Sequence, residues 1–270
     1  VDRSEYRPAP RRSGAFSRRA RAFFRAAIPR LFDVRAAVLE DPEKLASCRQ
    51  CILAVHPHGV LSLDHLLTVA GFDEALERAL PQSERSALSA GVLFKIPFVR
   101  ELGLWTGCVD AGRPTADACL RAGLSLSVVP GGEREQLLAQ RGPLECLVLR
   151  ERKGFVKLAL RHGVPLVPSY CFGEAQLYDQ SRLFMGFRSW VQRTLGVALV
   201  LPFGPGGVPG RPFPAPLRHV VGAPLDVPRI PEPSRAEVDE HHARYMAELE
   251  KLFARHRESA GYGQVKLELL

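Results

Sequence analysis

The sequence has no long apolar segment. No stretch approaches the roughly 18 consecutive apolar residues that a membrane-spanning helix needs. The first residues also lack the charged, apolar and small-residue succession of a secretory signal peptide. The sequence therefore predicts no membrane span within its 270 residues. The first residue is Val rather than Met, so this prediction covers these residues alone.

Cysteine is scattered rather than arranged in a framework. The six cysteines are spread along the chain, and the single Cys-x-x-Cys pair, Cys48 and Cys51, has no second pair that would complete a zinc site. At this chain length, reduced thiols in a protein that faces the cytosol are more typical than a disulfide scaffold. The hydrophobic content of 46% is ordinary for a buried core, so we expect one large domain or at most two small ones.

Positive charge is concentrated at one end of the chain. The formal net charge is +8, and residues 1–35 alone carry ten arginines against three acids. A basic arm of this kind suits anionic lipid headgroups or nucleic acid. The rest of the chain is nearly balanced and contains no basic stripe or nucleic-acid motif. We therefore expect no nucleic-acid partner.

Residues 16–32 have the apolar period of a helix. Phe16, Phe23 and Ile28 fall on one face, and Arg18 and Arg25 lie on or near the opposite one. A helix with a Phe-rich face and a basic face is typical of a membrane interface. The alternative, that the apolar face packs on the rest of the protein, is equally open.

From about residue 50 onward, strand-like apolar runs alternate with helical stretches. This alternation predicts an α/β fold, with a mostly parallel sheet covered by helices. The last helical stretch begins with Ser234 and Glu237 at capping-box spacing. Residues 202–216, rich in Pro and Gly, are predicted to be a loop. The predicted strands are 51–55, 89–94, 124–129, 146–149, 165–170, 197–203 and 219–222, and the predicted helices are 63–80, 96–102, 114–122, 151–162, 186–195 and 234–258.

The first predicted strand runs into the tetrapeptide His56-Pro57-His58-Gly59. Open parallel sheets place their sites beyond the carboxyl ends of the strands. Pro57 stops the strand, and Gly59 permits a backbone conformation that other residues resist. A neutral imidazole at this place can take a proton from a hydroxyl near pH 7. The alternative is a pair of structural histidines.

A second cluster follows the strand that ends near residue 129. Gly131 and Gly132 can bring backbone N–H groups close to a ligand. Glu133 and Glu135 come directly after them, and a carboxylate there can orient or polarise a histidine. A solvated turn is the alternative interpretation.

Cations crowd the helical stretch 151–162. Positive side chains near a helix start suit phosphate groups, both by charge and through the free N–H groups of the first turn. The apolar side of this helix, which includes Phe155, is expected to pack on the sheet. The alternative is an ordinary amphipathic helix without a ligand. The cations are Arg150, Arg152, Lys153, Lys157 and Arg161.

Four short motifs occur in a fixed order along the chain. They are HPHG at 56–59, GGxxE at 131–135, RxGFxxLAxxxG at 152–163 and LVPxxxFGE at 166–174. Together with the tail at 220–257, they resemble the acyl-CoA:diacylglycerol acyltransferase type 2 family, which includes monoacylglycerol and wax-alcohol acyltransferases. This family is part of the glycerolipid acyltransferase superfamily.

The resemblance implies an enzyme of the endoplasmic reticulum membrane or the lipid droplet that uses acyl-CoA and a lipid alcohol, without a metal or another cofactor. It implies an acyltransferase domain over residues 51–270, preceded by a basic amphipathic membrane-interface segment over residues 1–50. Whether the protein forms a homo-oligomer is left open by the sequence. The sequence also departs from the family. Residues 31–33 read LFD where the family has Tyr-Phe-Pro, no hairpin precedes them, and the superfamily's His-x4-Asp spacing falls on Leu63, one residue before Asp64.

On this basis His58 is the expected general base, and His56 or Glu135 is expected to orient it. The hypothesis is direct transfer of an acyl chain from acyl-CoA to the hydroxyl of diacylglycerol, without a covalent intermediate. Alternative acceptors are monoacylglycerol and fatty alcohol; alternatives of another class are a metal-dependent hydrolase that uses His-x-His and an inactive lipid-binding protein. The expected substrate-binding residues are Pro57, Gly59, Gly131, Gly132, Arg152, Lys153, Gly154, Phe155, Lys157 and Glu174.

Overall fold

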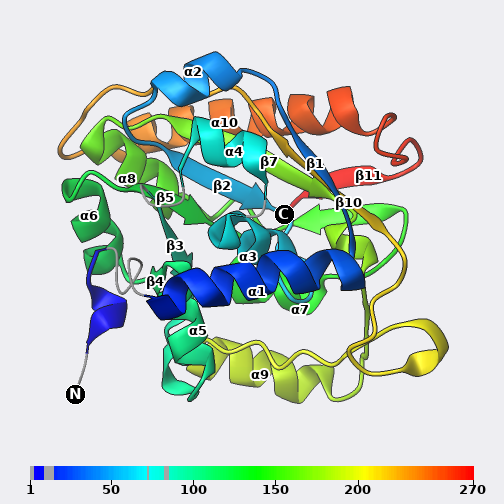
Figure 1. Ribbon diagram of the computed structural model, residues 1–270. Helices are drawn as coiled ribbons and strands as arrows, with labels where there is room; N and C mark the ends of the chain where they lie inside the picture. The colour runs from blue at the N-terminus through cyan, green and yellow to red at the C-terminus, as the bar shows by residue number, and fades with distance from the viewer. Residues whose placement is uncertain (1–2, 9–14, 72, 82–84) are drawn as a thin grey trace.

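Seven strands form the central sheet, in the order β1-β10-β7-β2-β5-β3-β4. The computed structural model describes residues 3–8, 15–71, 73–81 and 85–270 (Figure 1). Every neighbouring pair in the sheet is parallel except β10 and β7. The prediction of a mostly parallel α/β sheet is therefore confirmed. The strands are β1 Asp33–Leu39, β2 Ile52–His56, β3 Arg85–Ser89, β4 Cys108–Asp110, β5 Ser125–Val128, β7 Leu166–Phe172 and β10 Pro216–Val221.

Helices cover both faces of this sheet. The helices are α1 Ala15–Leu31, α2 Pro42–Ser47, α3 Leu63–Ala70, α4 Glu74–Ala79, α5 Val99–Thr106, α6 Arg113–Arg121, α7 Gly132–Leu138, α8 Gly154–His162, α9 Met185–Leu195 and α10 Arg235–His256. One core cluster joins the sheet to α6, α8 and α10, and others join its opposite face to α1, α2, α3 and α4. Because β2 and β7 are covered on both faces, every residue in them is buried, which explains their continuous apolar sequences.

Two smaller sheets lie beside the main one. β6, Leu144–Leu147, pairs in parallel with β11, Lys266–Leu269, so the end of the chain returns to the middle of the fold. β8, Asp179–Gln180, pairs antiparallel with β9, Pro202–Phe203. The fold also contains 3-10 turns at Ser4–Tyr6, Gly91–Lys95, Glu174–Gln176 and Pro205–Gly207.

Several predicted elements have different bounds in the structure. The helix predicted over 63–80 is divided, because Gly71 takes a left-handed conformation and caps α3. The strand predicted at 89–94 is wrong beyond its first residue, because β3 ends at Ser89 and a 3-10 turn occupies Gly91–Lys95. Only the last two residues of the strand predicted at 197–203 are extended as a strand. The capping box predicted from Ser234 and Glu237 is present at the start of α10.

The amino-terminal segment is attached to the body of the protein. β1 lies at the edge of the main sheet beside β10, although it precedes the expected boundary at residue 50. In α1, Ile28 is buried and the ring of Phe16 stacks on Trp105 of α5, whereas Phe23 and Leu31 are each 66% exposed. One part of the apolar face of α1 therefore packs on the domain, and another faces outward. The role of residues 1–50 at a membrane stays a prediction, and residues 1–2 and 9–14 lie outside the described residues.

In the part of the chain that the structure describes, no helix is both long enough and apolar enough to cross a bilayer. All six cysteines are free.

Candidate active site

His56 is the last residue of β2, and its ring is fully buried. Its Nε2 lies 2.9 Å from the hydroxyl of Tyr245, on the facing side of α10. Burial lowers the pKa of His56 to about 3, so this imidazole is neutral at physiological pH. A neutral, fully buried ring that is hydrogen-bonded to a tyrosine cannot contact a substrate. The contacts of His56 are those of a residue that holds the end of β2 against α10.

His58 lies two residues further on and is partly exposed. Its Nδ1 is 3.1 Å from the carbonyl oxygen of Gly59. A carbonyl can only accept, so Nδ1 carries the hydrogen in this contact and Nε2 is left with its lone pair. Burial lowers the pKa of His58, although the Gly59 carbonyl and the charge of Glu133 act in the opposite direction. The ring is therefore neutral at pH 7 and can act as a base.

Glu135 contacts the main chain around His58. Its Oε1 accepts the backbone N–H of His58 at 2.5 Å, and its Oε2 accepts that of Val148 at 2.8 Å. The carboxylate is buried at the first turn of α7, where burial raises its pKa to about 7. Glu135, in the GGxxE motif, thus connects the HPHG loop to the segment that follows β6 through backbone contacts. Through the backbone N–H of His58, rather than through the imidazole, it holds the loop that carries this residue.

Glu174 holds the other side of the same loop. It lies just beyond β7, fully enclosed, and accepts the backbone N–H groups of Leu63 and Asp64, both at 2.9 Å. These are free donors of the first turn of α3, so the carboxylate caps that helix. Burial raises the pKa of Glu174 to about 8. We predicted Glu174 to bind substrate, and the structure places it instead against the protein's own backbone.

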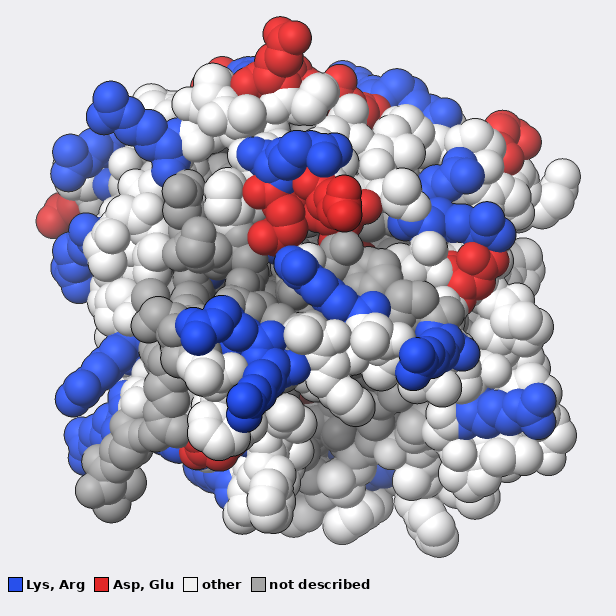
Figure 2. Space-filling view, in the orientation of Figure 1, with Lys and Arg blue, Asp and Glu red and all other residues white. Residues whose placement is uncertain are grey.

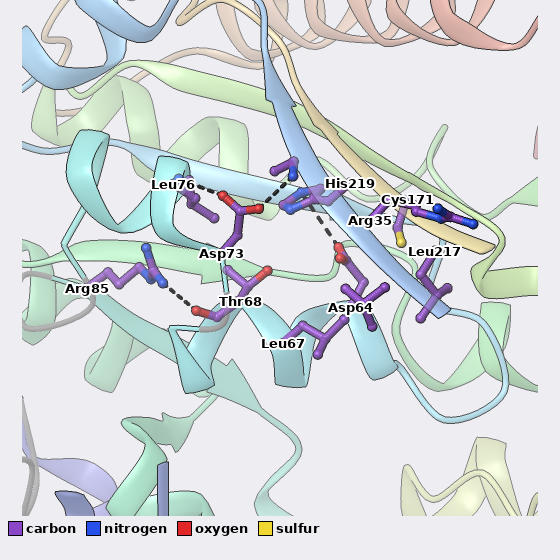
Figure 3. A pocket seen from close by; sticks show the side chains of 12 residues that line it. Arg35, Asp64, Leu67, Thr68, Asp73, Leu76, Arg85, Cys171, Leu217 and His219 are labelled. Carbon is purple, nitrogen blue, oxygen red and sulfur yellow. Dashed lines mark hydrogen bonds and ion pairs between the residues drawn. The ribbon is translucent and has the colours of Figure 1, made fainter. Parts of the chain in front are cut away.

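Asp64, the acid one residue beyond the superfamily's His-x4-Asp spacing, faces His219 of β10 (Figure 3). Its Oδ2 lies 3.6 Å from Nε2 of His219 on β10, too far for a hydrogen bond. Thr68 and Arg85 line the same enclosed cavity, whose volume is about 20 Å³. Neither Asp64 Oδ2 nor His219 Nε2 has a hydrogen-bond partner among the described residues. Asp64 therefore does not replace the missing acid beside His58.

A groove of about 350 Å³ adjoins the HPHG loop, a volume within the range of small-molecule sites. Three of the predicted site residues line it: Pro57, Gly59 and Glu135. Leu138, the last residue of α7, and Arg141, beyond its end, lie along the same groove. Gly131 and Gly132 lie at the start of α7, where their N–H groups have no partner within the helix.

The basic segment before α8 is arranged less simply than its sequence suggests. Lys153 donates to Asp239 on α10 at 2.7 Å, and Phe155 is buried edge-on against Tyr245. Arg152 is near enough to Glu135 for its charge to lower that group's pKa. Lys157 is exposed, and Gly154 is the first residue of the helix. Phe155 thus lies in the core, as the helical period predicted, and its expected role in substrate binding stays a prediction.

Other residues that contact or neighbour the two histidines of HPHG had no distinct signal in the sequence. Tyr245 was only one apolar position in the last helix, and His65 occupied one turn of a predicted helix. The structure places His65 near His58, whose positive charge would lower the pKa of His65, although burial is the larger cause of its value of about 4. The ring of His65 lies 3.3 Å from the hydroxyl of Ser127 on β5. These neighbours come from separate elements, so only the fold brings them together.

A model of the diacylglycerol acyltransferase family matches residues 6–269. The chain belongs to this family. Human acyl-CoA wax alcohol acyltransferase 2 is 34% identical over 82% of this chain and 70% of its own. Bovine diacylglycerol O-acyltransferase 2 is 31% identical, with 85% and 67% covered, and human 2-acylglycerol O-acyltransferase 3 is 32% identical, with 86% and 71% covered. The protein is accordingly an acyl-transferring enzyme.

The fold is also found in a solved structure. The crystal structure of the 1-acyl-sn-glycerophosphate acyltransferase PlsC from Thermotoga maritima superposes with a TM-score of 0.52. The match covers 88% of this chain and 80% of that chain, at 20% sequence identity. The glycerolipid acyltransferase fold that we expected is thereby confirmed.

Gly59→Ala is expected to lower both activity and stability. Gly59 has a φ of +59°, and a Cβ there would lie 2.6 Å from Oε1 of the buried Glu174. The substitution should therefore displace the HPHG loop, in addition to about 1 kcal/mol of left-handed backbone strain. Gly123→Ala is the matched control, because Gly123 has a φ of +83° and open space around its Cα. Equal transfer rates and equal melting temperatures for the two variants would contradict this account of the loop.

Proposed function

We propose that this acyltransferase moves a fatty acyl chain from acyl-CoA to the free hydroxyl of diacylglycerol, with His58 as the general base. The observation that carries the proposal is the geometry of His58, whose Nδ1 is engaged by Gly59 and whose Nε2 is left to accept a proton on a partly exposed ring. The family and the name of the bovine relative support the acceptor.

The reaction that follows needs no covalent enzyme intermediate. His58 Nε2 takes the proton of the acceptor hydroxyl as its oxygen attacks the thioester carbon. The carbon–sulfur bond then breaks and the new ester is formed. The CoA thiolate leaves and takes the proton that His58 removed from the acceptor hydroxyl. Developing negative charge on the thioester oxygen needs N–H donors, usually a large catalytic contribution. Gly59, Gly131 and Gly132 are the proposed donors, because the His58 N–H is already bonded to Glu135.

For the other substrate, we propose that Arg152 and Lys157 attract the phosphates of CoA. Lys153 is bonded to Asp239 and contributes less free charge. We further propose that the enzyme works at the cytosolic face of the endoplasmic reticulum membrane or at a lipid droplet. The basic helix α1, with Phe23 and Leu31 facing outward, supports contact with such a surface.

Fatty alcohol is the second candidate acceptor, because the human wax alcohol acyltransferase is at least as similar to this chain as the bovine diacylglycerol enzyme. The test is transfer of labelled acyl-CoA by the purified protein to diacylglycerol, monoacylglycerol and fatty alcohol, presented separately. We expect triacylglycerol to be the product formed with the highest kcat/KM. A higher value with fatty alcohol or monoacylglycerol would overturn the proposed acceptor, and no transfer to any of them would overturn the proposal as a whole.

A further inference from the structure

Helix α9 exposes its apolar side chains and buries a cation. Phe187 and Trp190 are 58% and 52% exposed, whereas Arg188, between them in sequence, is 2% exposed. A surface helix of a water-soluble protein has the opposite arrangement. Leu183, just before the start of the helix, is also 65% exposed. We call Leu183, Phe187 and Trp190 the α9 face.

The orientation of α9 is fixed by the contacts of Arg188. Its guanidinium donates to the side chain of Gln180 and to the carbonyl oxygens of Ser181 and Leu199. A buried cation is costly unless its donors are satisfied, so turning the helix to hide its aromatic residues would break all three contacts. On the outside, the rings of Phe187 and Trp190 stack with centroids 6.0 Å apart. The hydrogen bonds of Arg188 therefore keep these apolar residues on the outer side of α9.

The surroundings of the α9 face are apolar and positively charged. Phe184, Leu195, Leu199 and Leu201 are also exposed. No Asp or Glu occurs in residues 180–225, whereas exposed Arg182 and Arg193 belong to the same segment. Figure 2 shows mainly uncharged side chains along the lower edge of the molecule, where Figure 1 places α9. Aromatic residues beside arginines without acids are complementary to an anionic lipid surface.

The α9 face is also connected to the groove beside the HPHG loop. Gln180, just before α9, donates to the carbonyl oxygens of Gln136, Leu137 and Ala139 at the end of α7. Ala139 lines the groove, and the start of α7 carries Glu135 against His58. A surface that binds α9 is thus held at a fixed distance from the groove.

We propose that the α9 face docks on an anionic phospholipid surface and brings the groove to the membrane from which the lipid acceptor enters. Docking itself is a property of this chain alone, and its link to acceptor entry rests on the proposed function. The face is separate from α1, whose outward residues Phe23 and Leu31 come from another helix.

The first test measures vesicle binding with the full chain. Vesicles of phosphatidylcholine with phosphatidylserine are compared with vesicles of phosphatidylcholine alone, by co-sedimentation. We expect Phe187→Ser/Trp190→Ser to weaken binding by about tenfold or more, because two interfacial aromatic residues are lost. Phe23→Ser, on the outward side of α1, tests the proposed contact of that helix separately, and its effect should add to that of the Phe187→Ser/Trp190→Ser variant. Arg182→Gln/Arg193→Gln should weaken binding only to the vesicles that contain phosphatidylserine.

A second measurement locates the contact. The sequence contains two tryptophans, so Trp105→Phe leaves Trp190 as the only indole. We expect its fluorescence to shift to shorter wavelength when phosphatidylserine vesicles are added. An unshifted Trp190 in bound protein, or unchanged binding of the Phe187→Ser/Trp190→Ser variant, would overturn the proposal. Light scattering that shows a dimer in the parent chain and a monomer in this variant would overturn it in favour of a second copy as the partner.

Transfer assays separate this proposal from the proposed function. The docking variant should keep the parent's rate with a short-chain diacylglycerol in detergent micelles and lose rate only when the acceptor is in phosphatidylserine vesicles. If neither protein transfers an acyl chain to any lipid alcohol but the variant still loses vesicle binding, the proposed function fails and docking stands. A normal rate with vesicle-embedded acceptor in the variant would overturn the link between docking and acceptor entry.

Discussion

His58→Ala is expected to reduce kcat for acyl transfer by a factor of about 100 to 10,000, the usual contribution of a positioned general base. The free energy of unfolding should change by only about 1 kcal/mol, because the ring is partly exposed and its Nδ1 is hydrogen-bonded to the carbonyl of the neighbouring Gly59. The loss should therefore appear in single-turnover kinetics of a protein with a near-normal unfolding curve. Wild-type kcat in this variant would remove His58 from the mechanism.

The matched control is the other histidine of the motif. His56→Ala removes a fully buried ring and leaves the Tyr245 hydroxyl without its partner, so we expect a loss of about 2 kcal/mol or more in the free energy of unfolding. Tyr245→Phe should keep the ring of His56 in place, lose about 1 kcal/mol and retain transfer activity. If His56→Ala abolished acyl transfer without lowering stability, His56 rather than His58 would be the general base.

The division of labour within HPHG shows what a sequence can and cannot predict here. The strand, its end at Pro57 and the need for Gly59 follow from local rules on apolar runs, proline and glycine, and all three are present. The direction of each ring does not follow, because side chains alternate across a strand and the partner of His56 is Tyr245, 189 residues away. Local spacing carries no information on which helix covers that face.

The acids illustrate the same limit. Glu135 was expected to orient a histidine ring, and the structure shows its carboxylate on two backbone N–H groups, one of them that of His58. The sequence predicted that these groups would be neighbours, since they follow strands whose carboxyl ends meet. Which atoms meet depends on how α7 approaches β2, which packing decides. The pairing of Asp64 with His219 is of the same kind, since it joins α3 to a strand near the other end of the chain.

The free energy of unfolding is expected to fall by about 2 kcal/mol between pH 6.5 and pH 8, because two buried carboxyl groups lose their protons in this range. The pKa of Glu135 is raised to about 7 and that of Glu174 to about 8, against an ordinary value of 4.5. Between 4.5 and the raised values, the folded protein binds more protons than the unfolded chain, so stability decreases as pH rises.

Buried histidines have the opposite effect, mainly at lower pH. Burial lowers the pKa of His56 to about 3 and that of His65 to about 4, so the unfolded chain binds more protons around and below its ordinary histidine pKa of 6.5. Stability therefore rises with pH through these two groups, and above pH 6.5 each adds only about 0.4 kcal/mol more, as the unfolded histidines lose their remaining protons. The two carboxyl groups outweigh this term, so the window from pH 6.5 to pH 8 reports mainly on them.

Glu174→Gln removes one of the two titrating carboxyl groups. A glutamine at this position cannot ionise, so the decrease in unfolding free energy between pH 6.5 and pH 8 should shrink to about 1 kcal/mol, the contribution that remains from Glu135. At pH 6.5 the variant should be less stable than the parent, because the amide replaces an acceptor of the N–H groups of Leu63 and Asp64. Urea unfolding at a series of pH values measures both effects, with Glu250→Gln, on an exposed position of α10, as the control.

If the parent became more stable across this range, or if Glu174→Gln kept the full decrease in unfolding free energy, the carboxylates that hold the HPHG loop would have to be ionised throughout. The loop would then be held by charged rather than by protonated carboxyl groups, and His58 would work beside fixed negative charge at every pH in the window.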